Sequence, residues 1–280
     1  MNNIFKIGGQ VTDRSFIGRK GLLDKFKKWY LSDMDKVCKS IVGLTRIGKS
    51  SFISKVFEEI PEDILYINID LKEISTYQEL WYDIANSVMQ YVKHHNIINS
   101  ELFESIELLE DENISWMKLR KLVKNIFREV KSVNKRTIIV IDEFDYATNL
   151  FNNETKYYEL LRTIFSGSDY NVSSILISRR SLYLIEGTTY QSSTFHGIFE
   201  CFPFPGFDDD DMVEFYNFFI ENNIQLAKND KKDIEYYSGR SPFLLSILGH
   251  YIVDEYLQKG TISISSIFMN KCKSINLNSL

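Results

Sequence analysis

Two short stretches carry residue types at spacings that could do chemistry. The first, Gly43 to Ser50, reads Gly-Leu-Thr-Arg-Ile-Gly-Lys-Ser and fits the pattern G-x-x-x-x-G-K-[ST] of a phosphate-binding loop. Glycines at both ends let the backbone wrap closely around phosphates, so that successive N–H groups point inward as an anion nest. We expect Lys49 to reach the β- and γ-phosphates of a nucleotide and Ser50 to hold Mg²⁺ through its hydroxyl group.

The second stretch pairs two acids with a strongly apolar run. Residues 138–141 are Ile-Ile-Val-Ile, and Asp142 and Glu143 follow them. Four β-branched apolar residues predict a buried parallel strand with both carboxylates at its C-terminal tip, where open α/β sheets bind ligands. Asp142 is expected to hold Mg²⁺ through its water shell, and Glu143 to orient or deprotonate an attacking water.

The elements around these stretches have the periodicity needed to position them. A β-branched run at 37–42 precedes the phosphate loop, and apolar residues at helical spacing fill 51–60 after it. Further strands are predicted at 64–70, 174–178 and 198–204, and further helices at 75–92, with Ser75 as N-cap, and at 157–165. The sequence therefore predicts an α/β fold in which a parallel five-stranded sheet is flanked by helices.

Beyond Gly206 the pattern becomes wholly helical, with helices predicted at 212–220, 231–237 and 243–256. The acids from Asp208 to Asp211 suit a helix start, where they favour the helix dipole. We therefore expect an α/β core over residues 1–206 and a small helical lid domain over residues 207–280.

An insertion lies between the second strand and the acidic strand. Its acidic part, 101–112, is expected to be a solvated segment, and 115–130 to form a helix. On that helix Lys121, Lys124, Arg128 and Lys131 fall at spacings of three and four and form a basic stripe. The stripe is either a face exposed to water or a contact for nucleic acid or an acidic partner.

Bulk properties limit the class of protein. The 280 residues carry a formal net charge of −5, so the molecule as a whole is not a polycation built to coat nucleic acid. Three scattered cysteines (Cys38, Cys201 and Cys272) suggest reduced thiols and a cytoplasmic location. No apolar run is long enough to span a bilayer, so no membrane contact is expected. The four histidines show no metal-ligand spacing and no partner in the sequence.

These motifs together resemble the archaeal-type ATPases and the related STAND and origin-recognition branches of the AAA+ group. The resemblance extends from Phe16 to about Tyr256. It rests on the Phe16-Ile17-Gly18-Arg19 box, the phosphate loop, residues 141–144 (Ile-Asp-Glu-Phe), residues 178–180 (Ser-Arg-Arg), and residues 238–245 (Ser-Gly-Arg-Ser-Pro-Phe-Leu-Leu).

The resemblance implies roles for particular residues. The Gly-Arg box would lie beside adenine, and Arg179 would sense the γ-phosphate. The lid turn, residues 239–242 (Gly-Arg-Ser-Pro), would close over the nucleotide. Catalytic roles fall to Glu143, Lys49 and Arg179, and metal binding to Ser50 and Asp142. The expected ATP/ADP contacts are Phe16, Ile17, Gly18, Arg19, Gly43, Thr45, Arg46, Ile47, Gly48, Lys49, Ser50, Ser51, Arg240 and Pro242.

Arg240 departs from the family pattern, because it replaces a second glycine. Either the lid turn is altered or Arg240 contacts phosphate itself. The last helix is followed by too few residues for the winged-helix domain usual in relatives. The chain is thus expected to be either a stand-alone ATPase or the nucleotide-binding part of a longer protein.

Two functions remain open from the sequence. The first is a slow ATP-hydrolysing switch that controls a protein partner or self-assembly, commonly in antiviral defence for this resemblance. The second is a DNA-transaction ATPase, a loader or remodeller, which the basic stripe favours. A scaffold that holds nucleotide without hydrolysis is disfavoured, because Lys49, Ser50, Asp142 and Glu143 are all present.

Overall fold

The protein is described from a computed structural model that covers residues 3–5, 7–9, 11, 15–32, 35–97, 99–111, 113–133, 135–152, 154–187 and 194–269. The chain divides into two compact units, each with its own apolar core. Unit 1 comprises Met1–Lys27, Gly43–Glu58 and Phe204–Leu280, and unit 2 comprises Lys28–Val42 and Glu59–Pro203. Each unit is built from separate stretches of sequence.

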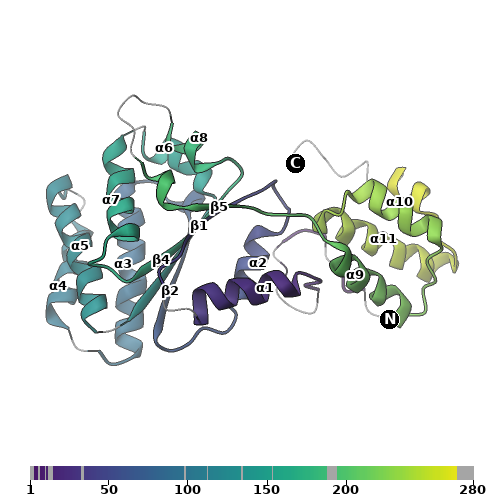
Figure 1. Ribbon diagram of the computed structural model, residues 1–280, viewed down its shortest axis with the longest axis horizontal. Helices are drawn as coiled ribbons and strands as arrows, with labels where there is room; N and C mark the ends of the chain where they lie inside the picture. The colour runs from purple at the N-terminus through teal and green to yellow at the C-terminus, as the bar shows by residue number, and fades with distance from the viewer. Residues whose placement is uncertain are drawn as a thin grey trace. The chain divides into compact units, whose positions relative to one another are not determined.

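Unit 2 contains the predicted parallel sheet (Figure 1). Its strands are β1 (Cys38–Val42), β2 (Ile64–Asp70), β3 (Arg136–Asp142), β4 (Val172–Ser178) and β5 (Glu200–Pro203), in the order β2-β3-β4-β1-β5. Strands β3 and β4 are buried along almost their whole length, as expected for β-branched runs covered on both faces. The fifth strand is shorter than predicted, because Ile198 ends a 3₁₀ turn (His196–Ile198) before it.

The strand register brings the C-terminal tips of the strands to one edge. Val42, the last residue of β1, pairs with Ser178, the last residue of β4. Asp142 ends β3 and pairs with Asp70 at the end of β2. Parallel pairing therefore gathers at one edge the residue before the phosphate loop, the acidic pair and the arginines that follow β4.

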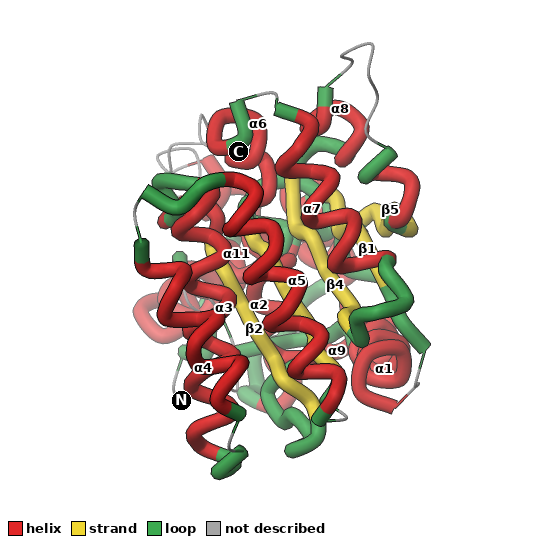
Figure 2. The backbone as a smooth tube through the Cα atoms, turned by 90° about the vertical axis from the view of Figure 1, so that its left-hand side faces the viewer, coloured by secondary structure: helices red, strands yellow, loops and turns green. Residues whose placement is uncertain are grey.

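Helices α3 (Tyr77–His94), α4 (Ser100–Glu107), α5 (Trp116–Ser132) and α7 (Thr155–Ser166) complete most of unit 2. Figure 2 shows α3, α5 and α7 alongside the strands, and contacts join α3 to β2, α5 to β3 and α7 to β4. The helix predicted at 115–130 is present as α5, and one face of it is buried, with Leu119, Val123, Ile126, Phe127 and Val130 in the core. Two short helices, α6 (Ala147–Leu150) and α8 (Leu182–Glu186), escaped the sequence analysis.

Two local predictions in unit 2 are wrong. The N-cap of α3 is Thr76 rather than Ser75, because its hydroxyl accepts the Glu79 N–H and Glu79 returns a bond to the Thr76 N–H. The acidic segment 101–112 is largely helical rather than a solvated insertion, over α4 and a 3₁₀ turn at Leu108–Glu110. Its apolar residues Leu102, Ile106 and Leu109 are buried in the core. The glutamates that the structure describes in this segment, at 101, 104, 107 and 110, are exposed.

Unit 1 holds α1 (Lys20–Lys27), α2 (Lys49–Val56), α9 (Asp209–Glu221), α10 (Lys228–Ser238), α11 (Pro242–Lys259) and α12 (Ile264–Ile267). All the secondary-structure elements described beyond Gly206 are helices, as predicted. Asp208 and Asp211 form a capping box at the start of α9, which confirms the acidic helix start. In the described residues no group of three or more His, Cys, Asp or Glu side chains is placed to hold a metal ion.

Several smaller predictions concern single side chains. Cys38 and Cys201 are free thiols, and Cys272 lies outside the described residues. His196 has a partner that the sequence did not show, since its Nδ1 lies 2.7 Å from the Glu186 carboxylate. Within the described ranges, none of the helices has the length and apolar character to cross a membrane.

Candidate functional site

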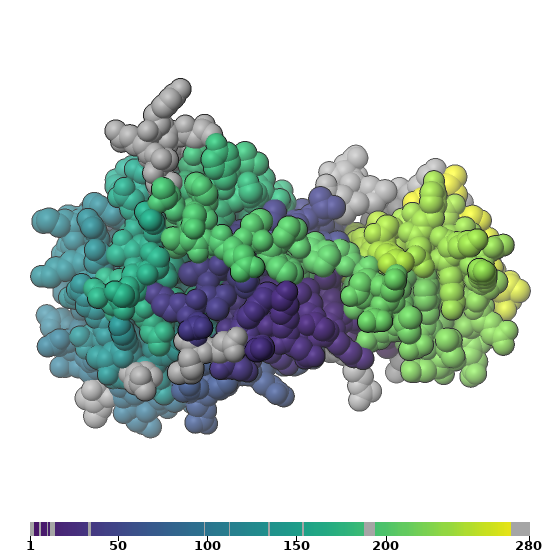
Figure 3. Space-filling model, viewed as in Figure 1, coloured from purple at the N-terminus to yellow at the C-terminus, as the bar shows by residue number. Residues whose placement is uncertain are grey.

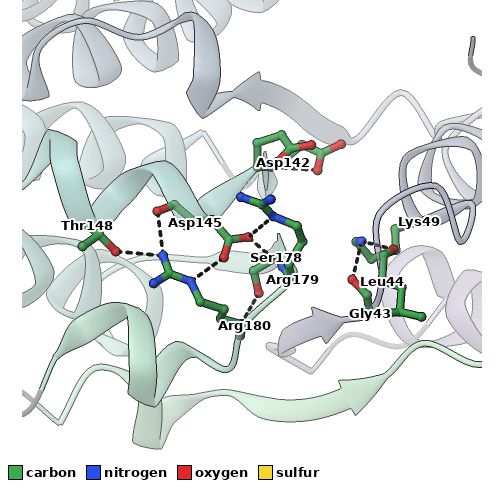
Figure 4. Close-up of polar contacts among 10 residues, drawn as sticks. Gly43, Leu44, Lys49, Asp142, Asp145, Thr148, Ser178, Arg179 and Arg180 are labelled. Atoms are coloured by element: carbon green, nitrogen blue, oxygen red, sulfur yellow. Dashed lines mark hydrogen bonds and ion pairs between the residues drawn. The ribbon is translucent and has the colours of Figure 1, made fainter. Parts of the chain in front are cut away.

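The phosphate loop follows β1 directly, and α2 begins at its lysine. Gly48, the N-cap residue of α2, has a φ of 94°, a left-handed conformation that glycine adopts without steric cost. The Lys49 ammonium group donates hydrogen bonds to the carbonyl oxygens of Gly43 (2.7 Å) and Leu44 (2.9 Å) (Figure 4). The lysine thus points back across the first residues of its own loop, a direction that suits its predicted role at phosphates.

Other loop residues contact the rest of unit 1. A Cβ added to Gly43 would lie 3.1 Å from the Phe204 Cβ, so a side chain there would crowd the neighbouring segment. The Arg46 guanidinium lies 4.8 Å from the centre of the Phe243 ring, near the start of α11. Ser51 Oγ accepts a hydrogen bond from the Val11 N–H at 3.0 Å. The loop is therefore tied both to the N-terminal segment and to a helix of the predicted lid.

The Gly-Arg box is packed against the start of α9. Gly18 has a φ of 77°, and a Cβ there would lie 2.8 Å from the Asp211 Oδ1 atom. That carboxylate accepts a hydrogen bond from the Arg19 N–H as well as from the Asp208 N–H. Only glycine fits this position, because both the backbone conformation and the nearby carboxylate exclude a side chain.

The side chain of Arg19 connects three segments of unit 1. Its guanidinium donates to the carbonyl oxygens of Pro205 (2.8 Å) and Ile47 (3.3 Å), and it lies 4.3 Å from the centre of the Phe204 ring. Burial lowers the pKa of Arg19 to about 10, although Asp211 and Asp208 oppose the shift. Arg19 therefore stays charged at neutral pH and links the phosphate loop to the segment that leads into the lid.

The lid turn keeps a glycine-like backbone although arginine replaces glycine. Arg240 has a φ of 60°, in the left-handed region. Its guanidinium forms ion pairs with Glu235 (2.8 Å) and Asp209 (2.6 Å), so its charge is engaged within the helices that follow residue 206. Pro242 is the first residue of α11, where the missing N–H costs nothing. Arg240 thus joins α9 to α10 through these two ion pairs. Its contact with phosphate stays a prediction.

The acidic edge of the sheet lies in unit 2. Glu143 follows β3 in the left-handed conformation, with a φ of 51°, and its N–H donates to the Asp142 Oδ1 atom at 2.7 Å. A non-glycine residue in that region is uncommon and carries a small strain that tends to occur at functional sites. The turn after β3 is therefore held by the Asp142 carboxylate itself.

A third acid, Asp145, joins this edge to the tip of β4 (Figure 4). Its carboxylate accepts the Arg179 N–H at 2.6 Å and the Arg180 Nε–H at 2.9 Å. Burial alone would raise the pKa of Asp145, but the hydrogen bonds from Arg179 and Arg180 outweigh it and hold the pKa below its ordinary value. Sequence analysis missed this residue because an acid in a turn after a strand has no distinguishing spacing.

The predicted metal ligands have the right chemistry for magnesium. Ser50 supplies a hydroxyl oxygen and Asp142 a carboxylate oxygen, and Mg²⁺ prefers oxygen ligands. Protein sites for Mg²⁺ commonly use one or two side chains, with water and substrate phosphates completing the shell. The small number of candidate ligands therefore fits a metal held together with a nucleotide.

The sheet order, the phosphate loop after β1 and the acidic tip of β3 define an α/β fold of the P-loop NTPase class. A family model described as an ATPase domain predominantly from Archaea matches residues 16–248. The chain belongs to this family and is an ATPase that binds ATP and ADP. The resemblance to the archaeal-type ATPases noted from the sequence is thereby confirmed.

Solved structures support the same fold. The Walker-type ATPase PABY2304 of Pyrococcus abyssi is 18% identical, with a TM-score of 0.64 over 99% of this chain and 80% of that chain. The Aeropyrum pernix ORC2 protein, solved as ADPNP–ADP complexes, is 12% identical, with a TM-score of 0.54 over 98% and 72%. Drosophila ORC bound to DNA is 8% identical, with a TM-score of 0.55 over 92% and 71%. A comparison with curated protein sequences found no match.

Proposed function

We propose that this ATPase is a molecular switch of the STAND type. ATP is hydrolysed slowly, the ADP form is the resting state, and the ATP form recruits a protein partner or assembles with further copies of the chain. Residues 1–206 serve as the ATPase core and residues 207–280 as the lid that responds to the nucleotide.

The observation that carries this proposal is the position of Arg19. One buried guanidinium bonds both to the phosphate loop at Ile47 and to Pro205, and the Arg19 N–H bonds to the start of α9 at Asp211. A loop that changes shape around a γ-phosphate must shift the Ile47 carbonyl or strain this network. A change in the conformation of the phosphate loop would therefore be transmitted through Arg19 to the helices beyond residue 206.

The remaining residues divide the chemistry. Lys49 and the loop N–H groups hold the phosphates, and Ser50 and Asp142 hold Mg²⁺, which neutralises phosphate charge when bound. Glu143 orients the attacking water and accepts its proton, and Arg179 contacts the γ-phosphate oxygens. The assignment of this switch to prokaryotic antiviral defence rests on the STAND resemblance alone. A viral infection assay that compares the survival of cells expressing wild type with that of cells expressing Lys49→Ala tests it.

Glu143→Gln tests the proposed chemistry. The amide cannot take a proton from water, so turnover should fall by about 10²–10⁴ while ATP affinity stays near that of wild type. Lys49→Ala is the matched comparison, because it should lose ATP binding itself. The measurements are ATPase rate, nucleotide affinity by calorimetry, and size-exclusion chromatography with ATP and with ADP. Hydrolysis within a few-fold of wild type in Glu143→Gln would remove Glu143 as the base.

A DNA-transaction ATPase is the second candidate, favoured by the basic stripe of α5. Lys121 and Arg128 are exposed and Lys124 is half-buried. Partial burial, and then the neighbouring charges of Arg120 and Arg128, lower the pKa of Lys124. Figure 3 shows the segment that contains α4 and α5 at the surface of unit 2. Two charges of the stripe are partly engaged, since Arg128 lies 3.7 Å from Asp169 and Lys131 bonds to the Ser168 carbonyl. A DNA-bound ORC has a similar fold, but the negative net charge weighs toward the switch.

A further inference from the structure

Asp145 is a buried, hydrogen-bonded carboxylate at the acidic edge of the sheet. Its side chain is 2% exposed, and it lies two residues after Glu143 in the 3₁₀ turn Phe144–Tyr146. One carboxylate oxygen accepts the Arg179 N–H, and the other accepts the Arg180 Nε–H. A single buried group thus fixes the turn that carries Glu143 to the tip of β4.

The two arginines use this carboxylate unequally. Arg180 also donates from its Nη2 atom to the Asp145 carbonyl and to Thr148 Oγ1, both at 3.2 Å, and Ser178 Oγ donates to the Arg180 carbonyl at 2.7 Å. The side chains of Arg179 and Arg180 are 55% and 47% exposed, so exposure does not separate them. The Arg179 Nε forms only a loose ion pair with Asp145 at 3.6 Å, beyond ordinary hydrogen-bond distance. Arg180 is therefore anchored through its side chain, whereas Arg179 is held mainly through its backbone.

We propose that Asp145 is a positioning residue that binds the Arg180 side chain tightly and the Arg179 side chain only loosely, so that the Arg179 guanidinium can leave it to meet the γ-phosphate while the Arg179 backbone stays tied to the turn that carries Glu143. This inference rests on the proposed function, because it assigns a support to the residues named there. The two guanidinium groups compete for one carboxylate. Because Arg180 takes the shorter contact, at 2.9 Å against 3.6 Å, Asp145 holds the Arg179 guanidinium only weakly against a nucleotide.

Glu186 provides a matched control within the same unit. Its carboxylate is 5% exposed and accepts the N–H groups of Phe195 (3.2 Å) and His196 (3.0 Å), besides the ring of His196. It is a buried, well-bonded acid like Asp145, but it does not lie on the turn after β3. Loss of its charge should affect stability without affecting the proposed γ-phosphate contact.

The experiment compares Asp145→Asn, Glu186→Gln and wild type for ADP affinity, ATPγS affinity, kcat, KM and melting temperature. Asparagine retains an acceptor for the Arg179 N–H but loses the charge that holds Arg180. We expect Asp145→Asn to lose about tenfold in ATPγS affinity, or about 1.4 kcal/mol, with ADP affinity unchanged. Its kcat should fall by about 10²-fold because the reacting groups lose their register, with a smaller change in KM. Glu186→Gln should lower the melting temperature and leave the ratio of ATPγS to ADP affinity as in wild type.

Arg180→Met gives a second test that does not alter the buried acid. With its partner gone, Asp145 should draw the Arg179 guanidinium inward, and ATPγS affinity should fall in the same direction as in Asp145→Asn. Equal losses for ADP and ATPγS in either variant, or unchanged preference in both, would overturn the inference. A wild type that turns over ATP but does not distinguish the two nucleotides would overturn the switch itself, and the positioning role with it.

Discussion

Replacement of Gly18 by alanine should destabilise unit 1 for two separate reasons. The φ of 77° at this residue is left-handed, which costs an L-residue about 1–2 kcal/mol. The new Cβ would also lie 2.8 Å from Asp211 Oδ1 and 2.9 Å from its Cγ, too close for atoms that are not bonded. Asp211 is buried and belongs to the capping box of α9, and disturbing a cap costs about 0.5–2 kcal/mol. The expected loss of unfolding free energy is therefore about 1.5–4 kcal/mol.

Gly260→Ala separates the two contributions. Gly260 follows α11 with a similar φ of 69°, but an added Cβ there meets nothing within 4 Å. It should cost only the left-handed term of about 1–2 kcal/mol. The measurement is urea unfolding of both variants followed by circular dichroism, with nucleotide affinity measured at low urea. Equal losses in the two variants would show that Asp211 yields freely, and would refute the tight packing between the Gly-Arg box and α9.

Two further predictions concern charged side chains. Arg179→Ala should bind ADP nearly as wild type and lose its preference for ATPγS, because an arginine can place two N–H groups on oxygens that ADP lacks; a matched drop for both nucleotides in calorimetry would indicate a structural role. If wild type binds duplex DNA, reversal of Lys121, Lys124 and Arg128 to glutamate should weaken that binding and make its log–log salt slope, about −0.9 per phosphate contact, shallower. If the triple variant binds DNA as wild type does, the stripe is only a face exposed to water and not a DNA contact.

Local sequence patterns located most of the sheet, because buried parallel strands must be continuous apolar runs. Strand β2 begins and ends where its pattern predicted, at Ile64 and Asp70. Strands β1 and β3 lie within two residues of their predicted ends. The phosphate loop was equally local, since glycine, lysine and serine at fixed spacing act on one ligand through one turn of chain. Such features need no knowledge of distant residues.

Predictions failed where a distant contact decided the outcome. The segment after Asn99 looks solvated by charge, but it folds as a helix because Leu102, Ile106 and Leu109 find a core to enter. Ser75 and Thr76 are equivalent N-caps by residue type, and the bonds with Glu79 select Thr76. Competition between neighbours of similar propensity is settled by geometry that composition does not contain.

The sequence by itself determined the class of this protein: a parallel sheet, a phosphate loop, an acidic strand tip and a helical C-terminal part. Only the tertiary structure decided which charged groups support that machinery. Asp145 reaches Arg180 across 35 positions of sequence, and Asp211 reaches Arg19 across 192. Neither acid stands at a motif spacing, because a buried carboxylate is placed by whichever donors the folded chain brings to it. The resemblance places Arg19 beside adenine, and the structure adds its hydrogen bonds to the phosphate loop and to Pro205 after β5. Those bonds too depend on which acceptors the fold brings to a buried charge.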